Sequence, residues 1–199
     1  MRKWKLKLAV ALIAITCSVF AGAAFADSDD DGHEGDGHVS LIPMEKKSYS
    51  GKPHVAPVVS ERYKKECGSC HFAYQPGLLP AKSWEKIMSG LEDHFGDNAE
   101  VDKEQAAWLK DYLVKNSADK SDAKASVKIL NSIKKGDSPI RISSTPYFVH
   151  EHHGIPLTAI RDNPKVKSLA HCQRCHTRAD LGNYSEHEVV IPNMGKWRD

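Results

Sequence analysis

The sequence has no excess of charge of either sign and very little methionine. Lys and Arg number 28 against 26 Asp and Glu, a net charge of +2, and beyond residue 37 the basic residues are interspersed with acidic ones. This mixture excludes the concentrated basic surface with which proteins bind nucleic acids. Only four Met occur, and none lies between Phe95 and Leu169. No thioether ligand for a metal can therefore come from that long stretch.

Residues 1–26 have the three parts of a secretory signal peptide: basic residues, an apolar run from Leu8 to Phe25, and small residues at the end. The pattern predicts export and cleavage before Asp27. It disfavours a membrane anchor, because the run contains Thr16 and Ser18 and lacks a charged flank after it. Cleavage removes four basic residues and no acidic one, which leaves 24 basic against 26 acidic residues and a net charge of −2.

Residues 27–57 predict a disordered acidic segment followed by an extended arm. The stretch 27–37 is acidic, rich in Gly and free of apolar side chains, so it cannot bury a core. Prolines recur in 41–59 and favour an extended chain. We expect two folded parts after it, an N-terminal domain at 58–136 and a C-terminal domain at 137–199.

The apolar spacing in 58–136 predicts a mainly α domain. We expect a short helix after a Ser60 cap, a helix over 83–95, a helix opened by Asp102 with Gln105, and a helix over 121–135 that ends at Gly136. The second of these places His94 on its buried stripe. In the fourth we expect Val127, Leu130 and Ile133 to point inward.

The stretch after Gly136 predicts little regular structure. Prolines at 139, 146, 156 and 164 forbid long helices. Residues 141–143 and 147–149 are at best short extended segments. We expect this part to owe its order to a bound group rather than to a large core.

Two CxxCH motifs indicate what this bound group is. They are Cys67-Gly68-Ser69-Cys70-His71 and Cys172-Gln173-Arg174-Cys175-His176. Two cysteines separated by two residues can bond to the two vinyl groups of one haem, and the following His binds the iron. The sequence therefore predicts two haem c groups, with Cys67, Cys70, Cys172 and Cys175 as attachment sites and His71 and His176 as the proximal iron ligands.

Two other uses of the cysteines fit less well. A zinc ribbon needs its two CxxC pairs roughly 15 to 20 residues apart, whereas these pairs are about a hundred residues apart. Disulfides are common in exported proteins, but they leave unexplained why a His follows both pairs.

The ligand on the other side of each iron decides what the haem can do. For the first haem we predict His94. The only Met between the motifs is Met88, and its position in the expected helix is typical of a core residue. For the second haem the candidates in the sequence are His150, His152, His153, His171, His187 and Met194. His171 adjoins Cys172 and can hardly reach the opposite face. One of the first three is expected to bind, and their spacing does not separate them.

The two motifs and the residues around them resemble the bacterial dihaem cytochrome c family. The resemblance rests on the stretch from Glu66 to Pro80, on Trp84 with the His94-Phe95-Gly96 triplet, on 141–147, and on CQRCHTRAD with Gly182. It covers roughly residues 58–192.

The resemblance implies an N-terminal domain like a class I cytochrome c, a C-terminal haem domain with little regular structure, and two His ligands at each iron. It assigns His94 to the first haem and His152 to the second, with His150 and His153 as alternatives because they flank it. It also implies a periplasmic electron carrier whose partner is a small monohaem cytochrome c or a membrane b-type cytochrome.

The alternative is a haem enzyme, such as a dihaem peroxidase or a small-molecule reductase, in which one iron keeps an open position. Dihaem peroxidases are much longer chains. A third possibility is a subunit of a membrane redox complex that docks through the arm at 41–59.

The spin state separates a carrier from an enzyme. If His binds both faces of both irons, no position is open for a small molecule. We expect an optical spectrum without a high-spin band, and no binding of cyanide or carbon monoxide by the untreated protein. A high-spin band or ready binding of either molecule would indicate an enzyme instead.

Overall fold

The computed structural model describes residues 51–197, which belong to one compact unit, Ser48–Asp199. The expected signal peptide and most of the segment 27–57 lie outside the described residues. The division into domains at 58–136 and 137–199 stays a prediction. No helix within 51–197 is long and apolar enough to cross a membrane.

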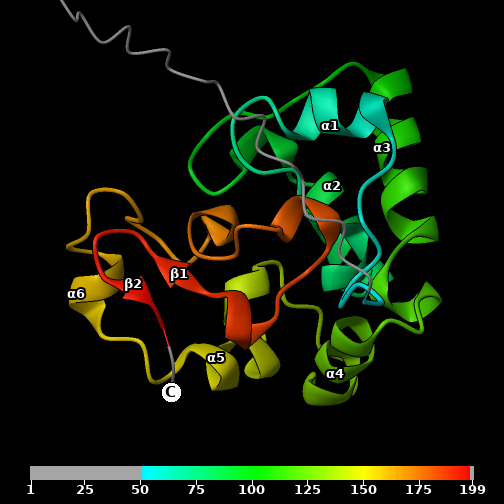
Figure 1. Ribbon diagram of the computed structural model, residues 1–199. Coiled ribbons are helices and arrows are strands. Elements are labelled where there is room, and N and C mark those ends of the chain that lie inside the picture. Colours follow the sequence, from blue (N-terminus) through cyan, green and yellow to red (C-terminus); the bar gives the residue numbers. More distant parts are fainter. Residues whose placement is uncertain (1–50, 198–199) are drawn as a thin grey trace, which may run out of the picture. The chain divides into compact units, whose positions relative to one another are not determined.

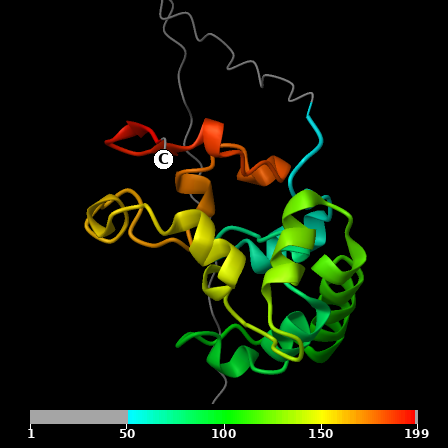
Figure 2. The same ribbon diagram turned by 90° about the horizontal axis from the view of Figure 1, so that it is seen from below.

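The described chain is mainly helical, as expected (Figure 1). Its α-helices are α1 (Glu61–Cys67), α2 (Ala81–Met88), α3 (Lys103–Lys115), α4 (Lys124–Ser132), α5 (Pro146–His152) and α6 (Leu157–Ile160). Short 3-10 turns are η1 (Pro76–Leu78), η2 (Leu91–Asp93), η3 (Ala118–Lys120), η4 (Ile142–Ser144), η5 (Cys172–Arg174), η6 (Ala179–Leu181) and η7 (Glu186–Glu188). Near the C-terminal end, β1 (Val190–Ile191) pairs antiparallel with β2 (Gly195–Lys196), the red hairpin of Figure 2.

Side-chain caps start the helices where the sequence provides them. The Ser60 hydroxyl accepts a hydrogen bond from the Tyr63 amide at the start of α1, and the Asp102 carboxylate accepts one from the Gln105 amide at the start of α3. Each cap satisfies an amide that the first helical turn leaves without a partner. These two helix starts were predicted from the sequence and are confirmed.

The expected helix over 83–95 is wrong at both ends. Helix α2 begins at Ala81 and ends at Met88, where the Ser89 hydroxyl donates to the Lys86 carbonyl. Ser and Gly at 89 and 90 favour a turn over a continued helix. His94 consequently lies after η2 in a tight turn, and not on a helical stripe.

The expected inward face of the fourth helix is wrong for Val127 but right for Ile133, which packs against the cluster of Val55, Leu78 and Ile129. In α4 the buried side chains are Ala125, Ser126 and Ile129, while Val127 is exposed. The reason is a close approach to Gly77, where an added Cβ would lie 2.9 Å from the Ser126 hydroxyl. Only a small side chain fits at that contact, so Ser126 occupies the buried face there, while Ile129 packs against Val55 and Leu78.

Residues 147–149 were expected to be extended, and they form part of α5 instead. Thr145 caps this helix by accepting a hydrogen bond from the Phe148 amide, and Pro146 occupies its first position. Proline is favoured there because its missing N–H has no partner to lose and its backbone angle suits a helix. Pro146, which prevents a longer helix from passing through this position, therefore starts a short one.

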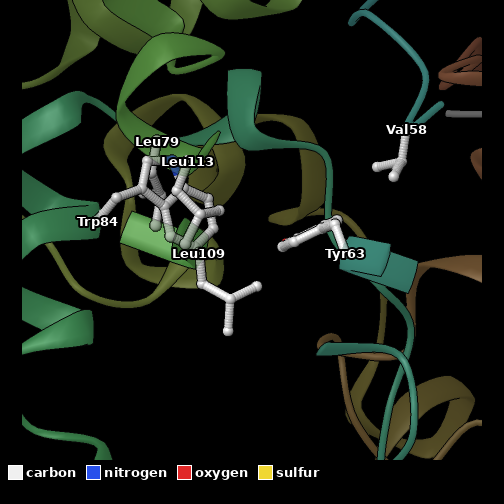
Figure 3. Close-up of a cluster of buried hydrophobic side chains, with 6 residues drawn as sticks. All are labelled: Val58, Tyr63, Leu79, Trp84, Leu109 and Leu113. Atoms are coloured by element: carbon white, nitrogen blue, oxygen red, sulfur yellow. The ribbon is translucent and has the colours of Figure 1, made fainter. Parts of the chain in front are cut away.

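The first core lies where α1, α2 and α3 meet, and α2 and α3 lie side by side. Figure 3 shows Leu79, Trp84, Leu109 and Leu113 gathered together, with Tyr63 directed toward them. The Trp84 indole donates a hydrogen bond of 2.7 Å to the Pro76 carbonyl, so its polar atom is satisfied inside the core. A second cluster contains Ala159, Ile160, Val166, Val189 and Ile191, and a third joins Val55, Leu78 and Ile129.

Truncation of Leu113 tests this core. Its side chain is only 2% exposed, so Leu113→Ala should lower the free energy of unfolding by about 2–5 kcal/mol through lost burial and the cavity left behind. Leu157→Ala is the control, since Leu157 is 64% exposed. Denaturant unfolding followed by far-ultraviolet circular dichroism measures both, and equal effects would contradict the packing described.

Candidate functional site

The first CxxCH motif begins at the last residue of α1. Gly68 caps the helix, and a Cβ there would lie 2.2 Å from the Lys64 carbonyl oxygen. Only glycine permits this tight exit. After it, the His71 Nδ1–H donates to the Phe72 carbonyl at 2.8 Å. This bond leaves the lone pair on Nε2 free to bind a metal.

His94 is held in a tight turn opposite this motif. The His94 amide donates to the Asp97 carbonyl at 2.7 Å, and the Gly96 amide donates to the Asp93 carboxylate. Phe95 adopts a positive φ of 63°, which is strained for an aromatic residue. Strain of this kind is typical of sites where the chain must hold a side chain in one direction.

The surroundings of His94 favour its neutral imidazole. Burial, followed by the neighbouring His71 and Arg141, lowers the pKa of His94. The Arg141 guanidinium lies 4.0 Å from the centroid of the Phe95 ring and so holds the turn from a distant part of the chain. A neutral imidazole is the form that binds iron.

The distance between His71 and His94 fits a metal held between them. Their ring centroids are 6.2 Å apart. A bond from a first-row metal to an imidazole nitrogen is about 2.0 Å, so two rings on opposite faces of one metal have centroids about 6 Å apart. The structure thus brings together the two residues that the sequence assigned to the first haem.

The second CxxCH motif forms the turn η5. The amides of Cys175 and His176 both donate to the Cys172 carbonyl, which gathers the three residues on one turn. Burial, then His152 and His54, lowers the pKa of His176 to about 4. Its Nδ1 atom is buried and has no hydrogen-bond partner within 51–197, so no hydrogen bond from that part of the chain fixes the tautomer of this ring.

Of the three clustered histidines, His152 faces His176. Its ring centroid lies 6.1 Å from that of His176, again the separation expected for two ligands of one iron. The His152 Nδ1–H donates to the Phe148 carbonyl at 2.8 Å, and this bond orients the ring. His150 and His153 are exposed and contact each other.

Of the remaining candidates for the second haem, His171 alone lines the cavity at the second motif. The His171 Nδ1–H donates to the Val166 carbonyl at 2.7 Å. His187 is exposed beside Glu186, and Met194 is 51% exposed. Neither His187 nor Met194 lines the cavity at the second motif.

The cavity at the second motif has a volume of about 290 Å³ and is lined by Cys172, Cys175, His176 and His152 with mostly apolar neighbours. A single water or ion needs only about 10–15 Å³ by the same measure, so this space suits a large flat group. No disulfide joins the described cysteines. Within 51–197 no three His, Cys, Asp or Glu side chains converge as an isolated metal site, so the two pairs do not share a zinc. These residues fit haem.

Sequence reasoning missed four residues at these sites. His54, in the expected arm, lines the second cavity, and its Nδ1 accepts a hydrogen bond from the Tyr184 amide. Tyr74 and Tyr184 lie beside the proximal histidines, and buried Gln75 links Tyr184 to the second motif. His54, Tyr74 and Gln75 form hydrogen bonds with residues 130, 96 and 104 positions away, so no local pattern marks those contacts. The available signals were that Tyr74 lies soon after His71 and that Tyr184 lies soon after His176.

Comparisons with known proteins agree with this geometry. The family model described as dihaem cytochrome c matches residues 63–184. A solved diheme cytochrome c from Shewanella baltica is 37% identical, covers 69% of this chain and 97% of its own, and superposes with a TM-score of 0.58.

Another diheme cytochrome c, from Rhodobacter sphaeroides, is 34% identical over 65% of this chain and all of its own, also with a TM-score of 0.58. A search of curated proteins gave no match. Since the family model spans more than half of the sequence and includes both motifs, the chain belongs to the dihaem cytochrome c family.

Proposed function

We propose that this chain is a periplasmic electron carrier in which His binds both faces of both haem irons. Dihaem cytochromes c are electron-transfer proteins with two haem c groups. The observation that carries the finer proposal is the pair of His–His separations, 6.2 Å between His71 and His94 and 6.1 Å between His176 and His152.

The chemistry of the carrier follows from its ligands. A bound haem iron takes up and releases one electron as it changes between its ferric and ferrous states. With His71 and His94 on one iron, and His176 and His152 on the other, no coordination position is left for a substrate. Two His ligands also favour a lower reduction potential than His with Met. The residues therefore support electron transfer without bond-making chemistry.

The compartment and the partners belong to the same proposal. Export of residues 27–199 through the predicted signal peptide would deliver the chain to the periplasm. There we expect it to exchange electrons with a small monohaem cytochrome c or a membrane b-type cytochrome. Stable purification as a free monomer would support a diffusing carrier over a fixed subunit of a membrane complex.

Removal of one cysteine pair tests the attachment sites. The Cys67→Ala/Cys70→Ala protein and the Cys172→Ala/Cys175→Ala protein should each retain one covalent haem per chain, because each pair holds its own group. Cys17→Ala is the control, since Cys17 lies in the predicted signal peptide, and it should retain both. Pyridine haemochrome absorbance and the mass of the purified chain count the haems. Full haem content after loss of either pair would contradict these assignments.

Replacement of the distal histidines tests the ligand sets. His94→Met and His152→Met should each remove the near-infrared magnetic circular dichroism band of a bis-His haem at a single iron, and should raise the potential of that haem. His153→Met is the matched control, because His153 is exposed and contacts His150. An unchanged spectrum in both test variants would rule out these two ligands.

A further inference from the structure

Tyr74 contacts both haem sites. Its ring centroid lies 5.0 Å from that of His71, the proximal ligand expected at the first iron. Its hydroxyl donates a hydrogen bond of 2.7 Å to the Ala170 carbonyl, two residues before Cys172. One side chain therefore connects a ligand of the first site with the peptide that carries an attachment cysteine of the second.

Gln75 extends this contact to the other end of the second motif. Its side chain is 1% exposed, and its amide N–H donates to the Ala179 carbonyl, three residues after His176. The same side chain accepts a hydrogen bond of 2.6 Å from the Tyr184 hydroxyl, and the Tyr184 ring lies 5.2 Å from that of His176. Tyr74 and Gln75 thus hold the second motif from both sides, at Ala170 and at Ala179.

The position of Tyr74 is itself fixed. The Tyr63 hydroxyl donates to the Tyr74 carbonyl at 2.8 Å, and the Tyr74 ring packs against both the first core and the cluster around Val55. A residue held by its backbone, its ring and its hydroxyl has little freedom to move. It can set a fixed distance between the groups that it joins.

We propose that Tyr74 is the positioning residue that couples the two haem sites, and that an electron exchanged between them passes through its ring. The proposal rests on the proposed function, since it needs a haem at each motif. One electron leaves the reduced site and arrives at the oxidised site, and no bond on Tyr74 forms or breaks.

The chemistry of Tyr74 suits a group that is not itself oxidised. Its hydroxyl donates to the Ala170 carbonyl, a neutral acceptor that does not take up the phenolic proton. A phenol that keeps its proton is much harder to oxidise than a phenolate. Tyr74 then contributes a bridging aromatic ring and a fixed geometry, while the electron resides only on the two irons.

The test measures electron exchange within one molecule. In partly reduced protein, exchange NMR of the haem methyl signals, extrapolated to low protein concentration, gives the rate between the two sites. Tyr74→Leu removes both the ring and the hydroxyl, so exchange should slow severalfold, because electron transfer weakens steeply as the packed path between two sites lengthens. Tyr74→Phe keeps the ring and loses only the anchor to Ala170, and should slow exchange by a smaller factor.

Tyr112→Leu is the matched control. Tyr112 is another half-buried tyrosine of the first core. Its ring stacks on Trp108 and packs against Tyr63, and not against a proposed haem ligand. Exchange in this variant should equal that of the unmodified protein. Equal slowing in Tyr112→Leu and Tyr74→Leu, or unchanged exchange in Tyr74→Leu, would overturn the proposal. If Tyr74→Leu fails to take up both haems, Tyr74→Phe decides, since an unchanged rate there excludes the anchor.

The two proposals fail in different ways. Haem content and magnetic circular dichroism of the unmodified protein report on two bis-His haems, whatever Tyr74 does. An open or His/Met iron in the unmodified protein would contradict the proposed function. Two intact bis-His haems in Tyr74→Leu with undiminished exchange would contradict only the role of Tyr74.

Discussion

Two imidazole rings that bind one iron must face each other across a gap of about 6 Å, and the fold meets this constraint twice by different means. At the first site the distal side chain comes from a turn, with Phe95 at positive φ and Arg141 stacked on its ring. At the second site it comes from α5, where the carbonyl of Phe148 orients His152. In both cases, contacts outside the CxxCH motif orient the side chain that we propose as the distal ligand.

The second site also explains the sparse regular structure of the C-terminal part. After residue 137 the described helices are one or two turns long, and the strands have two residues each. The apolar cluster of Ala159, Ile160, Val166, Val189 and Ile191 lies beside a cavity rather than closing into a continuous core. A haem in that cavity would complete the interior of this part of the chain. Short helices and turns then suffice, because the residues that line the cavity can pack against the large flat haem.

The sequence predicts the parts of this protein that depend on neighbours along the chain. The CxxCH motifs and the caps at Ser60 and Asp102 are local patterns, and so are Thr145 and Pro146, which start α5 where the sequence pattern predicts an extended segment. His94 lies opposite His71, but in a turn beyond α2 and not on the helical stripe that the apolar spacing predicts. Choosing His152 required the family resemblance, because three nearby histidines have similar spacing.

Contacts between distant segments could not be inferred in this way. The hydrogen bonds of Tyr74 with Ala170 and of Gln75 with Ala179, like the packing of His54 against Tyr184, join residues about a hundred or more positions apart. The small buried face of α4 likewise depends on Gly77, which approaches it from another part of the chain. Helical periodicity shows which side chains share one face of a helix, but it does not show which other segment of the chain packs against that face.

The most direct test of two closed haem sites is a crystal structure of the haem-loaded protein. We expect one iron bonded to Nε2 of His71 and of His94, and the other bonded to Nε2 of His176 and of His152. A water molecule, a methionine sulfur or a different histidine at either sixth position would contradict the account.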